Sequence, residues 1–550
     1  MKQHIKIFAT AIASLALCGC NDLLDTTPTD RVSDRLVWTD ISYATLYINN
    51  FYAYIDRYGQ FGSLQFSGNL TEGLTPTLKY GSSQPGSNAG DSNNYVFYPE
   101  RMTTDANLLG NWDDAYVKIR RMNEFLYSQK LYSSFTAEQN ATLEAQVRFF
   151  RAYVYFQLAK RHGGVILYSD INFTKNKARS TAEETWQFIT DDLDFAAANL
   201  PESWDADNKG RINKTMVYAF KSRAMLYAGR WEDAKNAADE VVKSSLYTLT
   251  DDYADSWKGD NSESILQFKY DKGNKFVHSF DKNYIPFGDF AAIGSDEYGG
   301  VAGPTQEMVE VYEDKNGNKV DWSAWHTGEP VAARPPFEQL EPRFAATILY
   351  NGCQWKGNTM DITVTGNHGR YMDYRSDNYA NGRTVTGYYL RKLLDESNTA
   401  DFMKVGSWQT WVEIRYAEVL LNRAEALYRL GESGKALDDI NEVRDRVNLP
   451  AKTGLTGEAL FEAIRHERMV ELAYEGHLYW DMRRWRLADK EWNGYRVHAL
   501  KPIAEGGSYS FQYVDADHQD RKFLTRTYVF PVPSSETNNN SLCEQYDEWK

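Results

Sequence analysis

Cysteine is scarce in this chain, with four residues in 550. Cys18 and Cys20 lie at the N-terminus, which leaves Cys353 and Cys543 either to pair or to stay free. Two thiols cannot form a disulfide framework. We also expect no metal at these cysteines, and no cofactor anywhere in the chain.

The apolar run near the N-terminus, residues 7–17, is too short to cross a bilayer comfortably. Basic residues precede it and a small residue precedes Cys20, which is the layout of a secretory signal over residues 1–19. Leu17-Cys18-Gly19-Cys20 resembles a bacterial lipobox, in which the last cysteine is lipidated. We therefore expect Cys20 to anchor the protein to outer-membrane lipid, with residues 20–34 as a polar tether. A soluble periplasmic protein cut at the same place is the alternative.

A surplus of positive charge is also missing. The formal net charge is −15, so we expect no nucleic-acid partner. With 42% hydrophobic residues, the chain can bury a large core. Aromatic residues reach 14%, with 37 Tyr and 15 Trp, which suits a protein that presents flat surfaces to a ligand outside the cell.

No catalytic constellation stands out: there is no Gly-rich phosphate loop, nucleophile elbow or His/Cys pairing. Glu467, Glu471, Glu475 and Asp481 are carboxylates of the type that glycoside cleavage requires. They are interleaved with arginines, so we predict a structural ion-pair network and a protein that is not an enzyme.

Two segments partly match the residue patterns of metal sites, but neither match is complete. His466 and His477 are eleven positions apart across a glycine, which is not the spacing of a helical zinc site, and we expect structural histidines. The segment that begins at Asp205 resembles a calcium loop, but Lys209 and Met216 occupy ligand positions. We therefore predict no metal site of these types.

The stretch 460–486 organises the chain, because its charged and apolar residues both follow a helical period. Glu467, Glu471 and Glu475 share one helix face, where like charges repel, so nearby arginines should neutralise them. Gly476 separates this helix from a second one, and the two together predict an αα-hairpin.

An internal repeat supports a helical scaffold. The segments that start at Ala224 and Ala426 superpose on Gly229/Gly431, and each reads as a helix, a glycine turn and a second helix. This is the tetratricopeptide pattern. We predict a mainly α fold in which about four such pairs form a right-handed scaffold, over residues 107–161, 213–243, 412–447 and 457–488. Residues 35–550 would form one domain, with an irregular ligand-binding insert of loops and short strands at 248–409 packed on the scaffold.

Several segments resemble one family. ERMVELAYEGHLYWDMRRW near residue 467, WDDAYVKIRRMNEF from Trp112 and YVFPVPSSETNNN from Tyr528 are similar to motifs of the SusD/RagB family. VILYSD after Gly164 is similar too, although the family usually has proline where Ile166 stands. This resemblance implies a cell-surface lipoprotein of the outer membrane that binds oligo- or polysaccharide and passes it to a SusC-like TonB-dependent transporter. A surface glycoside hydrolase, a scaffold without ligand and a lid for a non-glycan nutrient such as peptides are the alternatives.

The family has no shared motif for its sugar contacts, so candidates come from physical reasoning alone. An aromatic ring can cover the apolar C–H face of a sugar, and aromatics flanked by Gly, Asn, Ser or Asp are the ones we expect to be exposed. The candidate ring residues are Tyr80, Tyr95, Tyr98, Tyr284, Tyr298, Trp322 and Trp325, and the candidates for the hydroxyls are Asn69, Glu72 and Arg370.

Overall fold

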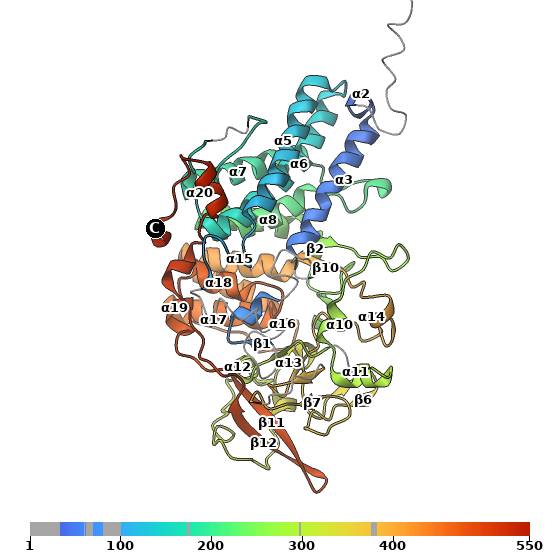
Figure 1. Ribbon diagram of the computed structural model, residues 1–550, viewed down its shortest axis with the longest axis vertical. Helices are drawn as coiled ribbons and strands as arrows, with labels where there is room; N and C mark the ends of the chain where they lie inside the picture. Colours follow the sequence, from blue (N-terminus) through green and yellow to red (C-terminus); the bar gives the residue numbers. More distant parts are fainter. Residues whose placement is uncertain are drawn as a thin grey trace, which may run out of the picture.

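Paired helices dominate the computed structural model, which describes residues 34–59, 61, 70–80, 101–172, 176–295, 299–375 and 382–550 (Figure 1). Helices α2 (Asp34–Val37) and α3 (Ile41–Tyr58) lead into the first pair. The pairs are α5 (Trp112–Tyr132) with α6 (Ala137–His162), α8 (Lys214–Ala228) with α9 (Trp231–Ser244), α15 (Tyr416–Arg429) with α16 (Ser433–Asp445), and α17 (Gly457–Glu471) with α18 (Leu478–Arg484). The four predicted pairs are present, and the mainly α fold is confirmed.

Local sequence explains where these helices begin and end. Thr136 and Gln139 form a capping box at the start of α6, in which each side chain bonds the other's backbone N–H. Gly229 closes α8 with φ +71°, a left-handed conformation that glycine adopts without strain. The predicted glycine turn between α8 and α9 is therefore confirmed.

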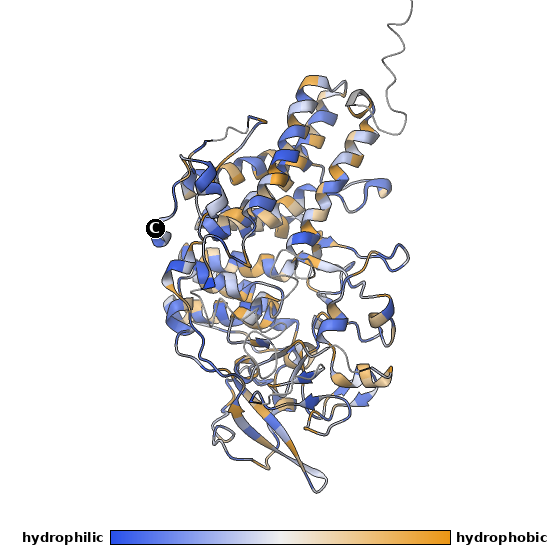
Figure 2. Cartoon of the chain, in the orientation of Figure 1, coloured by the Kyte–Doolittle hydropathy of each residue, from blue (hydrophilic) through white to orange (hydrophobic). Residues whose placement is uncertain are grey.

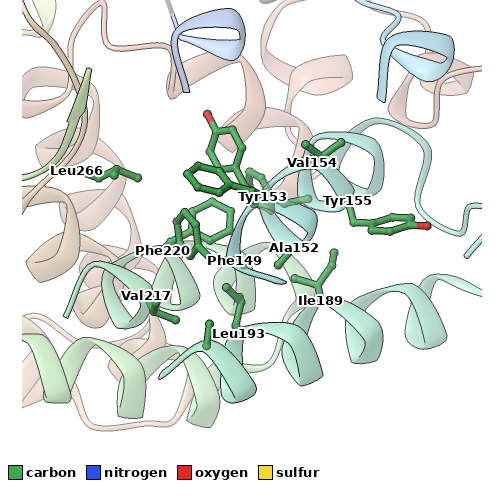
Figure 3. Close-up of a cluster of buried hydrophobic side chains, with 14 of the residues drawn as sticks. Phe149, Ala152, Tyr153, Val154, Tyr155, Ile189, Leu193, Val217, Phe220 and Leu266 are labelled. Carbon is green, nitrogen blue, oxygen red and sulfur yellow. The ribbon is translucent and has the colours of Figure 1, made fainter. Parts of the chain in front are cut away.

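The hydrophobic core of the helical scaffold lies between α6, α8 and α7 (Ala182–Asn199), a helix that the sequence patterns did not predict. Phe149 and Tyr153 of α6 pack on Phe220 of α8, with ring centroids 5.6 and 5.3 Å apart, and Ile189 and Leu193 of α7 lie in the same cluster (Figure 3). Buried aromatic pairs of this kind add about 0.5–1.5 kcal/mol each beyond their buried area. Helix α7 thus joins the first pair to the second.

The two repeated segments pack on each other, because α9 contacts α15 as well as α8. The chain between them leaves the scaffold as the insert and returns next to its starting point. Strand β2 (Ser264–Phe268), at the start of the insert, pairs antiparallel with β10 (Trp411–Arg415), at its end. This pairing closes the insert at its base.

The insert contains short elements only. Its helices are α10 (Phe280–Tyr284), α11 (Phe287–Ala292), α12 (Gln306–Val311), α13 (Pro342–Thr347) and α14 (Asp401–Lys404), with 3-10 turns η5 (Tyr253–Asp255) and η6 (Phe337–Gln339). In the described residues its short strands pair two by two: β4 (Ile348–Leu349) with β9 (Tyr389–Leu390), β5 (Gln354–Trp355) with β6 (Asn358–Thr359), and β7 (Arg370–Tyr371) with β8 (Arg383–Thr384). Strand β3 (Ala302–Pro304) pairs with β1 (Leu78–Tyr80), which precedes the insert in sequence. The predicted irregular insert is confirmed.

A second hydrophobic core fills the insert. Phe337, Phe344 and Tyr350 stack within it, with Phe344 and Tyr350 centroids 5.0 Å apart, and Tyr389 and Leu390 of β9 are fully buried beside them. Short strands and turns stay ordered because they bury these rings rather than through long ladders of backbone hydrogen bonds.

The C-terminal region adds a long hairpin of β11 (His498–Glu505) and β12 (Ser508–Asp515), at the lower end of Figure 1. This region also contains two short helices, α19 (Ala488–Glu491) and α20 (Ser534–Asn539), and two 3-10 turns, η7 (Thr525–Tyr528) and η8 (Asp547–Trp549). Two further 3-10 turns lie earlier in the chain, namely η1 (Thr71–Leu74) before β1 and η4 (Ala206–Asn208) before α8. Polar residues interrupt the apolar ones along the helices in Figure 2. Among the described residues, no helix combines the length and the apolar character that crossing a bilayer requires.

Candidate ligand-binding site

A cleft of about 800 Å³ lies where the insert meets the scaffold. Its walls come from segments far apart in sequence: Phe61, three residues after the end of α3, the turn at η5, the end of α13, the loop 391–397 and the loop 408–410 that leads into β10. The lining residues are Phe61, Ala254, Trp257, Lys258, Ala345, Ala346, Arg391, Leu393, Leu394, Asp395, Glu396, Ser397, Trp408, Gln409 and Thr410.

Three aromatic rings line this cleft, and each is held by contacts behind it. Phe61 stacks on His278 with centroids 4.2 Å apart and planes 17° apart. The Lys272 ammonium lies 4.4 Å from the centroid of the half-buried Trp408, and Lys392 Nζ lies 4.9 Å from that of Trp257. Rings fixed in this way lose little conformational entropy when a ligand covers them.

The polar groups of the cleft are fixed too. Arg391 Nε donates to Glu396 at 2.7 Å, and its Nη1 donates to the Ala345 carbonyl at 3.2 Å. The Ser397 N–H donates to the Asp395 carboxylate at 2.8 Å. A cleft with apolar ring surfaces and a few oriented polar groups suits a flat ligand that carries hydroxyls.

The loop 391–397 is attached to the organising helix α17 and the residues that follow it. Lys392 Nζ is fully buried and contacts Glu475 Oε1 and the Tyr253 hydroxyl, at 2.7 and 2.8 Å. Arg415 at the end of β10 contacts the same Glu475 oxygen at 2.7 Å. Both ends of the segment 392–415, which carries most of one side of the cleft, therefore meet at one carboxylate.

The predicted ion-pair network surrounds this attachment. Glu471 pairs with Arg415 at 2.6 Å, with Arg343 at 3.1 Å and with Arg446. Burial alone would raise its pKa, but these arginines hold the pKa of Glu471 well below its usual range. The pKa of Glu475 is likewise lowered to about 2, against the effect of burial, by Arg415 and Lys392.

The structural interpretation of these carboxylates is confirmed, with one correction. Asp481 pairs with Arg468 at 2.9 Å and with Arg484 at 2.8 Å, as expected from neighbouring sequence. The cations beside Glu467, Glu471 and Glu475 come instead from distant segments, namely Arg343, Lys392, Arg415, Arg444 and Arg446. The network therefore joins the insert to the scaffold rather than stabilising one hairpin.

The two histidines of this region also have structural partners. His466 Nε2 lies 2.8 Å from the Val311 carbonyl. Burial lowers the pKa of His477 to about 4, so its ring is neutral beside Glu418, 3.9 Å away. In the part of the chain that the structure describes, no group of three or more His, Cys, Asp or Glu side chains is arranged to hold a metal ion.

The predicted exposure of several candidate residues is wrong. Tyr80 and Tyr284 are 0% and 1% exposed and their hydroxyls bond each other, while Trp322 packs against Phe337 in the core of the insert. Glu72 is buried as well, and its carboxylate accepts the Gly476 N–H at 2.8 Å. The three aromatic residues belong to the second hydrophobic core, because short, glycine-rich segments also need buried apolar side chains to stay folded.

The other candidates lie apart from the cleft or outside the described residues. Trp325 is half-buried, and its Nε1 donates to the Ala333 carbonyl at 3.1 Å. Arg370 is also half-buried, with its guanidinium 4.3 Å from the Phe287 centroid. Neither lines the cleft. The candidates outside the described residues are Asn69, Tyr95, Tyr98 and Tyr298.

Sequence reasoning missed the three cleft aromatics, although its own criterion admits them. Phe61 precedes a glycine, Trp257 follows Ser256, and Trp408 follows Ser407. Flanking residues select many aromatics, and only the folded chain shows which of them share a cleft. The criterion therefore does not distinguish buried rings from cleft-lining ones.

Comparison with known proteins agrees with this architecture. Tetratricopeptide-like helix pairs that carry one large irregular insert define the class of SusD-like proteins. The chain belongs to the SusD family, whose model matches residues 262–549. A second model, described as starch-binding and associating with the outer membrane, matches residues 63–226.

Individual relatives align over most of their length. SusD-like protein P38 of Formosa agariphila is 24% identical over 504 residues, which is 87% of this chain and 91% of that protein. A SusD-like protein of Bacteroides fragilis has a crystal structure that matches with a TM-score of 0.80 and 27% identity, over 95% of this chain and 100% of that chain. A SusD-like carbohydrate binding protein of the same species matches with a TM-score of 0.75 and 24% identity, over 92% and 99% of the two chains.

Proposed function

We propose that this protein is a non-catalytic, cell-surface lipoprotein that captures oligo- or polysaccharide and delivers it to a SusC-like TonB-dependent transporter of the outer membrane. The observation that carries the proposal is the cleft itself, with Phe61, Trp257 and Trp408 on its walls and oriented polar groups between them. The carbohydrate-binding description of a structural relative supports it.

The chemistry of sugars fits the cleft. A pyranose ring has an apolar C–H face, and covering about 50 Å² of it with an indole ring contributes about 1.2 kcal/mol at roughly 25 cal/mol per Å². The Arg391 guanidinium, Asp395 and Gln409 line the same cleft, and their side chains are of types that bond hydroxyls. Several weak contacts of this kind suit capture followed by release to a transporter.

The arrangement of carboxylates supports binding rather than hydrolysis. Glycoside cleavage requires two carboxyl groups on either side of the bond, about 5–10 Å apart. The two carboxylates that line the cleft, Asp395 and Glu396, are consecutive, and Glu396 is paired with Arg391. Purified protein that releases reducing sugar from a bound polysaccharide would favour a surface glycoside hydrolase instead.

Attachment and delivery rest on the sequence. Cys20 follows a lipobox-like segment, and the resemblance to SusD-like proteins implies a transporter beneath the helical side. Incorporation of a palmitate analogue should disappear in Cys20→Ala. Purification in mild detergent should recover a large β-barrel partner with the protein, and recovery of the free monomer alone would count against delivery.

A glycan array with lipid-free protein tests the binding function. We expect signals from one class of polysaccharide, with starch-derived maltooligosaccharides as the first probe because of the matched family description. Trp408→Ala should remove the signal. Tyr95, Tyr98, Tyr298, Asn69, Trp325 and Arg370 remain predicted contacts for a ligand that extends beyond the cleft. Binding of peptides in place of every glycan would favour a lid for a non-glycan nutrient.

A further inference from the structure

A buried carboxylate lies behind the cleft without lining it. Asp281 of α10 is 0% exposed. Its Oδ1 accepts the backbone N–H of Asp395 at 3.0 Å and Nε2 of Gln409 at 2.8 Å. Asp395 and Gln409 belong to the two loops, 391–397 and 408–410, that wall the cleft. One carboxylate oxygen therefore joins both loops.

The second oxygen of Asp281 strengthens the same link. Oδ2 accepts the Ser407 hydroxyl at 2.9 Å and, more weakly, Nδ2 of Asn398 at 3.4 Å. The Ser407 oxygen in turn accepts the backbone N–H of Asp281 at 3.1 Å. All four donors to the carboxylate are neutral, so its negative charge is balanced by hydrogen bonds and not by an adjacent ion pair.

The backbone of the cleft wall needs such support. Leu393 has φ +71°, in the left-handed region that non-glycine residues rarely occupy. Its carbonyl accepts the second N–H of the Gln409 amide at 3.1 Å. A strained residue persists only where surrounding contacts hold it, and here Gln409 contacts both Leu393 and Asp281.

We propose that Asp281 is the positioning residue of the cleft: its carboxylate holds the loops 391–397 and 408–410, together with the adjoining Asn398 and Ser407, in their binding geometry. This rests on the proposed function of the cleft as the glycan site. Asp281 touches no ligand in this role and acts through Asp395 and Gln409.

The surroundings of Asp281 place its protonation in a physiological range. Burial raises the pKa of its carboxyl to about 6, although the Asp395 N–H, the Ser407 hydroxyl and the charge of Lys356 lower it. Lys356 is engaged by Asp289 at 2.7 Å, and the Asp395 carboxylate raises the pKa further. His278, which pairs with Ser407 through the backbone, is neutral because burial lowers its pKa to about 4.

Protonation changes which hydrogen bonds can form. A neutral carboxyl carries its own O–H, so the oxygen that faces both the Ser407 hydroxyl and the Asn398 amide can no longer accept from both. The bonds to Asp395 and Gln409 also lose the strength that an anionic acceptor gives them. Even so, the raised pKa means that the closed geometry binds the proton more tightly than a state with open loops and a hydrated carboxyl, so a falling pH does not open the loops.

Amide hydrogen exchange on the lipid-free protein tests the link without any ligand. In Asp281→Asn, peptides covering 391–398 and 405–410 should exchange about tenfold faster at pH 7.5, which corresponds to the loss of about one hydrogen bond. Wild type at pH 5.0, corrected for the intrinsic exchange rate, should exchange no faster in these peptides than wild type at pH 7.5. Asp439→Asn is the matched control, because burial also raises the pKa of Asp439 to about 6 but its partner is Arg423 on the scaffold. It should behave as wild type in both peptides.

Affinity for a glycan then tests the positioning role. With maltoheptaose, or the oligosaccharide that gives the strongest array signal, Asp281→Asn should bind about tenfold more weakly than wild type at pH 7.5, and wild type should bind no more weakly at pH 5.0 than at pH 7.5. Equal exchange in wild type and Asp281→Asn, or altered exchange with unchanged affinity, would overturn the proposal.

Failure of the proposed function gives a different result. Wild type would then bind no glycan, and the positioning role would fall with it, while exchange would still report whether Asp281 holds the loops. If Asp281→Asn does not fold, Ser407→Ala removes the Oδ2 partner and keeps the carboxylate. Its exchange in the two peptides should rise in the same way, and unchanged exchange there would refute the link.

Discussion

Replacing Glu471 by glutamine tests whether the buried ion network holds the insert on the scaffold. The side chain is 0% exposed and contacts Arg343, Arg415 and Arg446. Removing one member of a buried charge pair costs about 3–5 kcal/mol. Each of the three arginines keeps another carboxylate, from Glu263, Glu475 or the pair Glu341 and Glu467, so we expect the lower end, about 3 kcal/mol.

Thermal unfolding of the lipid-free protein measures this loss. At about 2.1 cal/mol/K per residue, the chain of 550 residues has an unfolding entropy of roughly 1.2 kcal/mol/K, so 3 kcal/mol lowers the Tm by about 3 °C. Glu462→Gln is the matched control, because Glu462 lies on the same helix, is exposed and pairs only with Arg465 at its surface. It should change the Tm by less than about 0.5 °C, since surface pairs contribute little.

The pH dependence has a definite sign. The pKa of Glu471 is depressed in the folded state, so its contribution is fully present above the pKa of the unfolded chain, near 4.5. It is lost as the pH falls below that value toward the folded pKa. The difference between wild type and Glu471→Gln should stay constant from pH 8 to about 5.5 and shrink at pH 4. A variant that melts with wild type at pH 7.5, or a difference that grows on acidification, would refute the reasoning.

Three further measurements probe other parts of the molecule. Trp408→Ala should weaken glycan binding by about 1–2 kcal/mol in calorimetry, because a cleft-lining anchor ring is lost, and Trp325→Ala should leave the cleft's affinity unchanged; the reverse order would place the site elsewhere. In native lipid-free protein at pH 7.5, Cys353 and Cys543 should resist maleimide, because both are buried free thiols whose pKa burial raises to about 11, and both should react in denaturant. Thr181→Ala removes the capping box of α7 and should cost about 1 kcal/mol of unfolding free energy, seen in urea titration, whereas no change would mean that the cap is dispensable.

Helical periodicity predicted the scaffold well because each helix pair is a local unit. Gly229 and Gly431 mark turns within about thirty residues of sequence, and alanines such as Ala234 mark close helix contacts. The sequence patterns did not predict helix α7, although Thr181 and Glu184 form a capping box at its start. The packing of α9 on α15 brings the two repeats together across the insert, and no local pattern encodes such a contact.

The sequence predicted the type of binding site but not the residues that form it. We expected exposed aromatic side chains, but those of Tyr80, Tyr284 and Trp322 are buried and form part of a hydrophobic core. The glycine-rich segments around them have no regular apolar period, so the sequence pattern did not reveal this core. Phe61 and Trp408 meet at one cleft through tertiary contacts over more than 300 residues of sequence. The partners of Glu471 were misplaced for the same reason, since Arg343 and Arg415 arrive from the insert.

Because Lys392 and Arg415 both contact the Glu475 oxygen, the chain between them is a closed loop with fixed ends. Changes in length or sequence within such a loop cost little closure entropy and leave its base in place. Exposed positions of this stretch, such as Thr399 and Ala400, can therefore vary in sequence, whereas Asn398, Phe402 and Ser407 are buried and keep their contacts.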